Sequence, residues 1–345
     1  MAAMAERLRN RIRLDGPLPF AAFMEEALYG QGGYYNREDV VIGERGDFVT
    51  GSSLSPLFGR TTARLLRRLD DALGRPADLL EAGCGSGTHL RAVAAAVGGR
   101  RRLYGWDRVA RDLGDGLEPL SGLEALEAGI SGLVFSYELF DALSVHRLVG
   151  GEGGAVGELW VALDEAGGFC WQRGELSQPG LDEMLDGSTL EPGQVADLAP
   201  GWAPLYRRLA GTLSVGLIVT CDYGFERSAL LDTRIRRHGT LACHRAHRVH
   251  RDALRDPGEQ DLTAHVDFTA LREVGEQEGL QTVVLTRQAR WLTALGIFDE
   301  IEGEAERRQA AALLDGGAMG EEIRVLVQAR GVEPGEVLDL AVLGV

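Results

Sequence analysis

The feature that most constrains this chain is a run of alternating glycines between an apolar strand pattern and a helical pattern. Gly83, Gly85 and Gly87 follow the mostly apolar strand pattern at 79–82 and precede the helical pattern at 90–97. Glycine permits positive φ and places no Cβ between the backbone and a ligand, while the N-terminus of a following helix presents free N–H groups. The order of strand, glycine turn and helix therefore predicts a site for a nucleotide-type cofactor.

The glycine spacing differs from the dinucleotide fingerprint G-x-G-x-x-G. Here it is G-x-G-x-G, and Glu81 stands two residues before the first glycine; we interpret this variant as favouring S-adenosylmethionine over NAD. Asp107 stands 20 residues after Gly87, at the end of a second strand pattern. An acid at this place accepts hydrogen bonds from ribose hydroxyls. We therefore expect Glu81, the three glycines and Asp107 to bind the cofactor.

The alternation of strand and helix patterns predicts the fold class. A chain of 345 residues holds one large domain with elaborations, or two domains. From residue 77 onward the patterns alternate, which predicts an α/β fold with a Rossmann-like, mostly parallel sheet covered on both faces. We expect this domain to span 76–298, after an N-terminal helical region at 1–75 and before a C-terminal helix and strand at 299–345. Residues 150–205 are predicted to insert a β-hairpin and an excursion, in which the stretch 177–204 is a mobile lid or simply an excursion of the chain.

Charge and cysteine usage exclude some classes of protein. The net charge of −16 argues against a general nucleic-acid binder and favours cationic partners. Four cysteines without a C-x-x-C motif indicate neither a disulfide framework nor a zinc site, and no metal is expected. No apolar run is long enough for a membrane span or a signal peptide, so we expect a cytoplasmic protein without a membrane partner.

One basic segment runs against the acidic balance. Residues 234–255 contain seven Arg and four His, which leaves a nucleic-acid contact open. Three of the histidines, His244, His247 and His250, also leave a metal site open. Their spacing by three spreads them around a helix and onto both sides of a strand, so we favour a solvated basic strand or loop.

Acidic residues stand where predicted strands end. Glu138 and Asp141 follow the third strand, and Asp222 and Tyr223 follow a strand at 217–221; ligands bind at such ends in open α/β sheets. Methyl transfer from a sulfonium requires alignment of the acceptor, exclusion of water and removal of a proton. A carboxylate can hold a guanidinium acceptor by charge-assisted hydrogen bonds. Glu138 is the first candidate for this role and Asp141 the second, although both could simply cap a helix.

Several motifs resemble those of the MidA-type methyltransferases. The match covers roughly residues 12–298, and its last two motifs are the most specific. These motifs are Gly-Gly-Tyr-Tyr at 32–35, Gly-Asp-Phe-Val-Thr at 46–50, Ser-Pro-Leu-Phe-Gly at 55–59, Tyr-Glu-Leu-Phe-Asp-Ala-Leu at 137–143, Asp-Tyr-Gly at 222–224 and Pro-Gly-Glu-Gln-Asp-Leu-Thr-Ala-His-Val-Asp-Phe at 257–268.

The resemblance implies a class I methyltransferase fold that uses S-adenosylmethionine. The family includes relatives of the mitochondrial methyltransferase that assists assembly of respiratory complex I, so the implied activity is arginine methylation of a protein. It also implies a bacterial, cytoplasmic member. By the same resemblance, the cofactor side includes Gly46, Asp47 and Thr50. The substrate side includes Asp222, Tyr223 and His265.

The chain departs from the family pattern near the expected acceptor site. Tyr137 stands where the family usually has Asn, Ser52-Ser53 where it has Pro-Glu, and Ser86 where it often has Arg. These departures leave open a second function, that of a weakly active or inactive cofactor-binding assembly factor that holds a partner protein. Methylation of an adenine base is disfavoured, because the Pro-Pro dipeptide of those enzymes is missing after residue 137.

Overall fold

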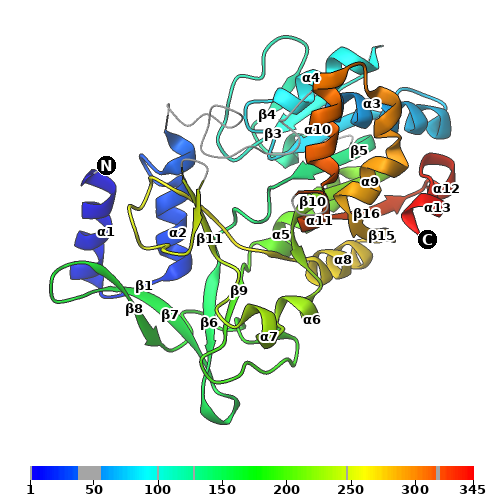
Figure 1. Cartoon of the computed structure of the whole chain (residues 1–345). Helices are drawn as coiled ribbons and strands as arrows, with labels where there is room; N and C mark the ends of the chain where they lie inside the picture. The colour runs from blue at the N-terminus through cyan, green and yellow to red at the C-terminus, as the bar shows by residue number, and fades with distance from the viewer. Residues whose placement is uncertain (1, 38–55, 99–100, 127–128, 246–247, 316–318) are drawn as a thin grey trace.

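The computed structural model describes residues 2–37, 56–98, 101–126, 129–245, 248–315 and 319–345. In Figure 1 the large sheet and the helices that pack on it occupy the right of the view, and the N-terminal helices with a smaller sheet lie on the left. Among the helices of these ranges, none has the length and apolar character needed to cross a lipid bilayer.

The large sheet is mostly parallel, as predicted. Its strands run in the order β15-β16-β10-β5-β2-β3-β4, and β14 pairs with the end of β10. Strands β10, β5, β2, β3 and β4 are parallel, whereas β16 is antiparallel to both neighbours. The bounds are β2 Asp78–Ala82, β3 Leu103–Trp106, β4 Glu118–Leu120, β5 Ile130–Tyr137, β10 Leu213–Phe225, β14 Val266–Asp267, β15 Gln281–Arg287 and β16 Ile323–Arg330. The strand order reverses between β2 and β5, and ligands bind doubly wound sheets at such a reversal.

Alternation of side chains along the strands builds a core on each face of this sheet. Leu79, Leu133 and Leu217 pack with helices α3, α4, α9 and α10. The residues that follow each of these leucines face the other way and pack with α5 and α8. The helix bounds are α3 Pro56–Leu73, α4 Thr88–Val97, α5 Trp202–Thr212, α8 Phe268–Gln277, α9 Gln288–Leu295 and α10 Glu304–Leu314. Helices on both faces confirm the predicted Rossmann-like α/β class.

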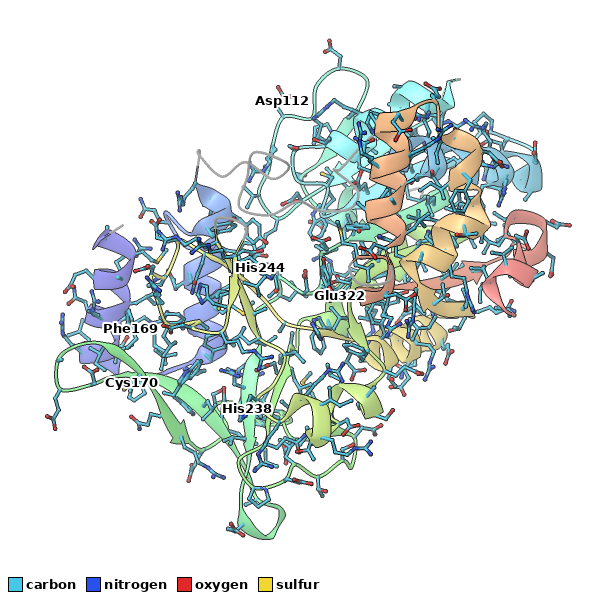
Figure 2. All side chains as sticks on the ribbon, in the orientation of Figure 1. Asp112, Phe169, Cys170, His238, His244 and Glu322 are labelled. Carbon is cyan, nitrogen blue, oxygen red and sulfur yellow. The ribbon has the colours of Figure 1, made fainter. Side chains whose placement is uncertain are left out.

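The predicted hairpin is part of a larger antiparallel sheet. Within the described residues its order is β1-β7-β6-β9, with β8 on β7. The bounds are β1 Leu18–Pro19, β6 His146–Gly150, β7 Val156–Leu163, β8 Phe169–Gly174 and β9 Val195–Leu198. In the stretch 177–204, Leu181 and Leu185 are buried in the core and β9 pairs with β6; its interpretation as a mobile lid or excursion stays a prediction. Helices α1 Ala2–Asp15 and α2 Phe20–Tyr29 lie beside this sheet, and Figure 2 labels Phe169 and Cys170 on its outer strand.

The basic segment forms strands of a third small sheet, ordered β12-β11-β13. The bounds are β11 Ala242–Arg245, β12 Arg248–His250 and β13 Asp261–Thr263. Short helices complete the described chain, namely α6 Arg227–Leu230, α7 Thr233–Arg236, α11 Met319–Glu322, α12 Pro334–Val337, α13 Leu340–Leu343, and the 3-10 turns η1 Tyr34–Asn36, η3 Leu123–Ala125, η4 Glu152–Gly154, η5 Glu183–Leu185 and η6 Ile297–Glu300.

The C-terminal strand has an unexpected place. The sequence assigns it to a segment after residue 298, yet β16 lies inside the large sheet between β10 and β15. The boundaries of the three predicted segments stay a prediction, and the structure adds that the last segment completes the central sheet.

Candidate functional site

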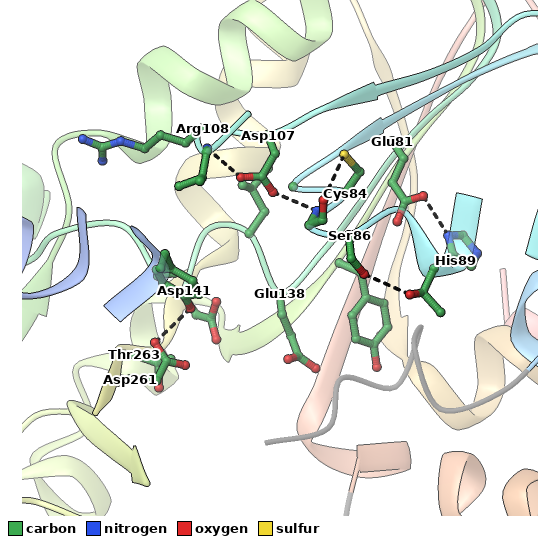
Figure 3. A pocket seen from close by; sticks show the side chains of 18 of the residues that line it. Glu81, Cys84, Ser86, His89, Asp107, Arg108, Glu138, Asp141, Asp261 and Thr263 are labelled. Carbon is green, nitrogen blue, oxygen red and sulfur yellow. Dashed lines mark hydrogen bonds and ion pairs between the residues drawn. The ribbon is translucent and has the colours of Figure 1, made fainter. Parts of the chain in front are cut away.

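A pocket of about 290 Å³ lies at the carboxyl ends of β2, β3, β5 and β10. Its volume is near the lower end of the range for small-molecule sites. Figure 3 shows Glu81, Cys84 and Asp107 on one side of it and Asp141, Asp261 and Thr263 on another, with Glu138 between these groups. The pocket therefore occupies the edge at which the sequence predicts ligand binding.

The glycine loop adopts a backbone that other residues rarely take. The φ angles of Gly83, Gly85 and Gly87 are 74°, 52° and 74°. A Cβ on Gly83 would lie 3.0 Å from the Leu139 side chain, and one on Gly87 would lie 3.0 Å from that of Leu113. Gly83 and Gly85 line the pocket, while Gly87 is the N-cap of α4 and lies outside the lining. The loop thus leaves its backbone bare toward the pocket, which suits close approach of a cofactor.

Asp107 connects the ends of β2 and β3. Its Oδ2 accepts a hydrogen bond from the N–H of Gly85 at 2.8 Å, and its Oδ1 accepts one from the N–H of Val109 at 2.9 Å. Each carboxylate oxygen has a further lone pair. Asp107 therefore shapes the glycine loop and still has the capacity to accept hydrogen bonds from ribose hydroxyls. Bare glycines and a carboxylate of this kind fit S-adenosylmethionine.

A buried pair behind the loop joins Glu81 to the helix that follows. His89 Nδ1 lies 3.2 Å from Glu81 Oε2, and His89 Nε2 lies 3.0 Å from the hydroxyl of Thr62 on α3. Glu81 and His89 both line the pocket. His89 was missed by the sequence reasoning, although its position directly after the glycines was the available signal.

The turn after β5 holds its first acidic residue in a strained conformation. Glu138 has a φ of 49°, which costs a non-glycine residue about 1–3 kcal/mol. Its N–H donates to the carbonyl of Cys221 at 2.9 Å. Asp222 Oδ2 accepts from the N–H groups of Leu139 and Phe140 at 3.1 and 2.8 Å. Asp222 is thus fully buried under this turn and outside the pocket lining, where it positions the two residues predicted to be catalytic.

Carboxyl groups crowd around this turn. Burial and the neighbouring Asp222, Glu138 and Asp261 raise the pKa of Asp141 well above its usual range. Burial also raises the pKa of Asp222 to about 7. The hydrogen bonds that its carboxylate accepts from backbone N–H groups oppose this rise. The cluster therefore retains protons at neutral pH that exposed carboxyls would have lost, and a cation in the pocket would favour their release.

The raised pKa of Asp222 predicts that stability falls as pH rises. The unfolded chain loses this proton near its ordinary pKa of 3.8, whereas the folded protein keeps it until about pH 7. Between those values the folded state binds more protons, so the free energy of unfolding decreases with rising pH. Urea unfolding measured from about pH 5 to about pH 8 checks this.

The Asp222→Asn variant provides the comparison for this pH series. It removes the titration, and we expect a shallower slope than in the wild type whatever its absolute stability. Equal slopes in the two proteins would show that Asp222 does not hold the proton.

Aromatic side chains from distant segments form another wall. The rings of Tyr29 and Tyr35 stack with centroids 5.3 Å apart, and Tyr35 Oη donates to Asp261 Oδ1 at 2.9 Å. Arg108 lies over the Tyr29 ring at 4.0 Å. Two of these residues lie in motifs that resemble the family and could have been predicted from them: Tyr35 ends Gly-Gly-Tyr-Tyr, and Asp261 lies within the motif at 257–268.

The strand β13 explains which residues of that last motif reach the pocket. Asp261 and Thr263 line it, because residues two apart on a strand face the same side. His265 follows the strand and lies outside the lining, against Phe225 with ring centroids 5.4 Å apart. Burial lowers the pKa of His265 to about 4. The predicted substrate-side group is thus divided, since Tyr223 lines the pocket while Asp222 and His265 do not.

The basic strand also contributes to the pocket. His244, labelled in Figure 2, lines the pocket from β11, and its Nε2 lies 3.3 Å from the Thr263 hydroxyl. The predicted basic strand is present, with Arg248 and Val249 exposed, whereas His244 is half-buried and burial lowers the pKa of its imidazole. Gly46, Asp47 and Thr50, predicted on the cofactor side, lie outside the described residues.

Comparison with known proteins agrees with this geometry. A family model described as S-adenosyl-L-methionine-dependent methyltransferase matches residues 107–286, just over half of the chain. The chain is 28% identical over 329 residues to the mitochondrial protein arginine methyltransferase NDUFAF7 homolog of Drosophila melanogaster, covering 80% of this chain and 71% of that protein. It is 25% identical over 318 residues to mitochondrial NDUFAF7 of Xenopus tropicalis, covering 79% and 70%.

A solved structure extends the similarity to nearly the whole fold. A Burkholderia thailandensis protein of methyl transferase type, crystallised with S-adenosyl-homocysteine, is 30% identical, with a TM-score of 0.85 over 96% of this chain and 93% of that protein. S-adenosyl-homocysteine is what remains of S-adenosylmethionine after its methyl group has left. The chain described here belongs to the MidA-type family of methyltransferases, and its cofactor is S-adenosylmethionine.

Proposed function

We propose that this protein methylates an arginine side chain of a partner protein. The observation that carries the proposal is that Glu138 and Asp141 line the same pocket as Gly83 and Gly85. An acidic, tyrosine-lined space beside a cofactor loop suits a cationic, planar acceptor. The names of the Drosophila and Xenopus relatives support the same acceptor.

Each side of the pocket has a distinct task in this reaction. S-adenosylmethionine supplies an electrophilic methyl group on a positively charged sulfur. Glu81, Gly83, Gly85 and Asp107 would hold this cofactor, and Asp107 would accept from its ribose hydroxyls. Gly46, Asp47 and Thr50 stay assigned to the same side as part of the proposal.

The acidic turn would act on the acceptor. The Glu138 carboxylate binds the guanidinium by charge-assisted hydrogen bonds and takes its proton as the new C–N bond forms and the C–S bond breaks. Asp141, buried beside it, would release its proton when a cation enters the pocket, and its negative charge would then favour that cation. Tyr223 closes the pocket near the end of β10 and helps to exclude water.

Replacing Asp107 with asparagine tests the cofactor half of the proposal. Asp107 now accepts hydrogen bonds from two backbone N–H groups. The asparagine amide would point its own N–H₂ at one of these donors. We expect S-adenosylmethionine affinity to fall roughly 5- to 150-fold, because a partly buried donor of the cofactor loop loses its acceptor. Isothermal titration calorimetry measures the change.

Asp112→Asn is the matched control for this variant. Asp112, labelled in Figure 2, accepts from the N–H of Gly114 at 2.9 Å in an exposed turn and lies outside the pocket. The Asp112→Asn variant should bind S-adenosylmethionine with the affinity of the wild type. Equal affinity in Asp107→Asn would remove Asp107 from the cofactor site.

A further inference from the structure

A second hollow lies at the same edge of the large sheet, beyond the end of β10. Its volume is about 560 Å³, and three arginines line it, Arg287, Arg290 and Arg324. They come from the end of β15, from α9 and from the start of β16. We call these side chains together with Phe225 and Arg236 the arginine hollow. It stands out in a chain whose net charge is −16.

Phe225 organises two guanidinium groups of the arginine hollow. The guanidinium carbon of Arg236 lies 3.6 Å from the centre of the Phe225 ring, and that of Arg324 lies 5.2 Å from it. Both distances lie within the range of a cation–π interaction, so one ring attracts both guanidinium groups. Arg236 Nη1 donates to the carbonyl of Ala229 at 2.6 Å, and both guanidinium groups carry further N–H donors of the kind that bind oxyanions.

The positive charge of the arginine hollow exceeds the negative charge beside it. Glu321 pairs with Arg287, and Glu226 pairs with Arg272 outside the hollow at 3.2 Å. Within the described ranges, no carboxylate lies within 4.0 Å of the guanidinium nitrogens of Arg236, Arg290 or Arg324. Both acids of the lining are therefore already paired, and these cations are left over.

Repulsion between the guanidinium groups of the arginine hollow acts most clearly on Arg324. Burial, Arg287 and Arg236 lower the pKa of Arg324, while Glu226 opposes them. Arg324 is half-buried, so water only partly screens this repulsion. An anion placed among the guanidinium groups would relieve it.

The arginine hollow is adjacent to the pocket of the proposed reaction. Tyr223 lines that pocket and Phe225 lines the hollow, two residues further along β10, a separation of about 7 Å. On α11, Met319 lines the pocket and Glu321 the hollow. A molecule that fills the pocket can therefore reach the hollow with a neighbouring group.

We propose that the arginine hollow binds an oxyanionic side chain, phosphorylated or carboxylate, on the same partner protein that presents its acceptor to the pocket. The assignment of the partner rests on the proposed function, whereas the binding of an oxyanion by the hollow does not. Such a site would select acceptors that have an acidic or phosphorylated residue near the methylated one. It would also give an acidic protein one local attraction for an anionic group.

Calorimetry with three probes tests the site. Inorganic phosphate, a short peptide with one phosphoserine and its serine counterpart are titrated into the wild type, Arg324→Gln and Arg307→Gln. Arg307 is a matched control, because its side chain is 70% exposed on α10 and its replacement removes the same charge. We expect phosphate and the phosphopeptide to bind the wild type and Arg307→Gln alike. Arg324→Gln should bind both at least about tenfold more weakly.

Each other outcome overturns a named part of the proposal. No binding of phosphate to the wild type, or equal binding to Arg324→Gln, refutes the site. Phosphate binding without a preference for the phosphopeptide over its serine counterpart refutes the partner assignment. S-adenosylmethionine is titrated into the same samples, which shows that Arg324→Gln is folded. Failure of the wild type to bind this cofactor would refute the proposed function and leave the phosphate result standing.

Discussion

Replacing Glu138 with glutamine is expected to slow methyl transfer by about 10²–10⁴-fold, the usual contribution of a positioned proton acceptor. Glutamine keeps the size of the side chain but can neither take the proton nor offset the charge of a guanidinium. Affinity for S-adenosylmethionine should stay within about threefold of the wild type, because the glycine loop and Asp107 are unchanged. The measurement is transfer of a labelled methyl group from the cofactor to proteins of a cell extract, with methylated arginine as the product detected.

The control is Glu118→Gln, which removes an equivalent charge from an exposed position on β4. It should transfer methyl groups at the wild-type rate. Full activity of Glu138→Gln would exclude Glu138 as the proton acceptor. A wild type that binds the cofactor and methylates no protein would favour the other function considered, an assembly factor that holds its partner without catalysis.

Replacing Gly85 with valine should abolish S-adenosylmethionine binding, with a loss of more than about 100-fold. Gly85 has a φ of 52° and lines the pocket, so a branched side chain there is strained and fills space needed by a ligand. Calorimetric titration of the cofactor measures this loss, and circular dichroism reports whether the variant is folded.

Gly116→Val separates strain from blockage of the pocket. Gly116 has a φ of 80°, so valine there carries a comparable backbone penalty, but nothing lies within 4 Å of its added Cβ. It also lies outside the pocket lining. We expect it to lose some stability and to retain full affinity. Wild-type affinity in Gly85→Val would show that the cofactor does not approach the glycine loop.

The features that could be predicted well are those that depend on residues close together in the sequence. The glycine turn, the strands β2, β5 and β10 and the hairpin of β7 and β8 each follow from a local pattern of apolar spacing and turn residues. Glu138 and Asp141 were identified by the same logic, since a strand pattern ends just before them. The short strands β1 and β9 were missed, because two or four residues without a flanking motif give no recognisable pattern.

Roles that depend on long-range contacts could not be predicted. From the sequence, Asp222 is predicted to lie in the pocket. In the structure, its carboxylate instead accepts hydrogen bonds from the backbone N–H groups of a turn more than 80 residues away in the chain. His265 and Asp261 belong to one motif, and only the register of β13 decides that Asp261 faces the pocket.

By itself, the sequence determined the fold class, the cofactor loop and the acidic turn, because strand, turn and helix preferences act over a few residues. Only the tertiary structure decided which side chains share the pocket, and that Arg236 and Arg324 lie over Phe225 with Arg287 in the same hollow. These arginines come from three separate elements that the packing of β10, β15 and β16 brings together. Their repulsion, and hence the expected affinity for an oxyanion, exists only in the folded chain, because charges interact through distance in space.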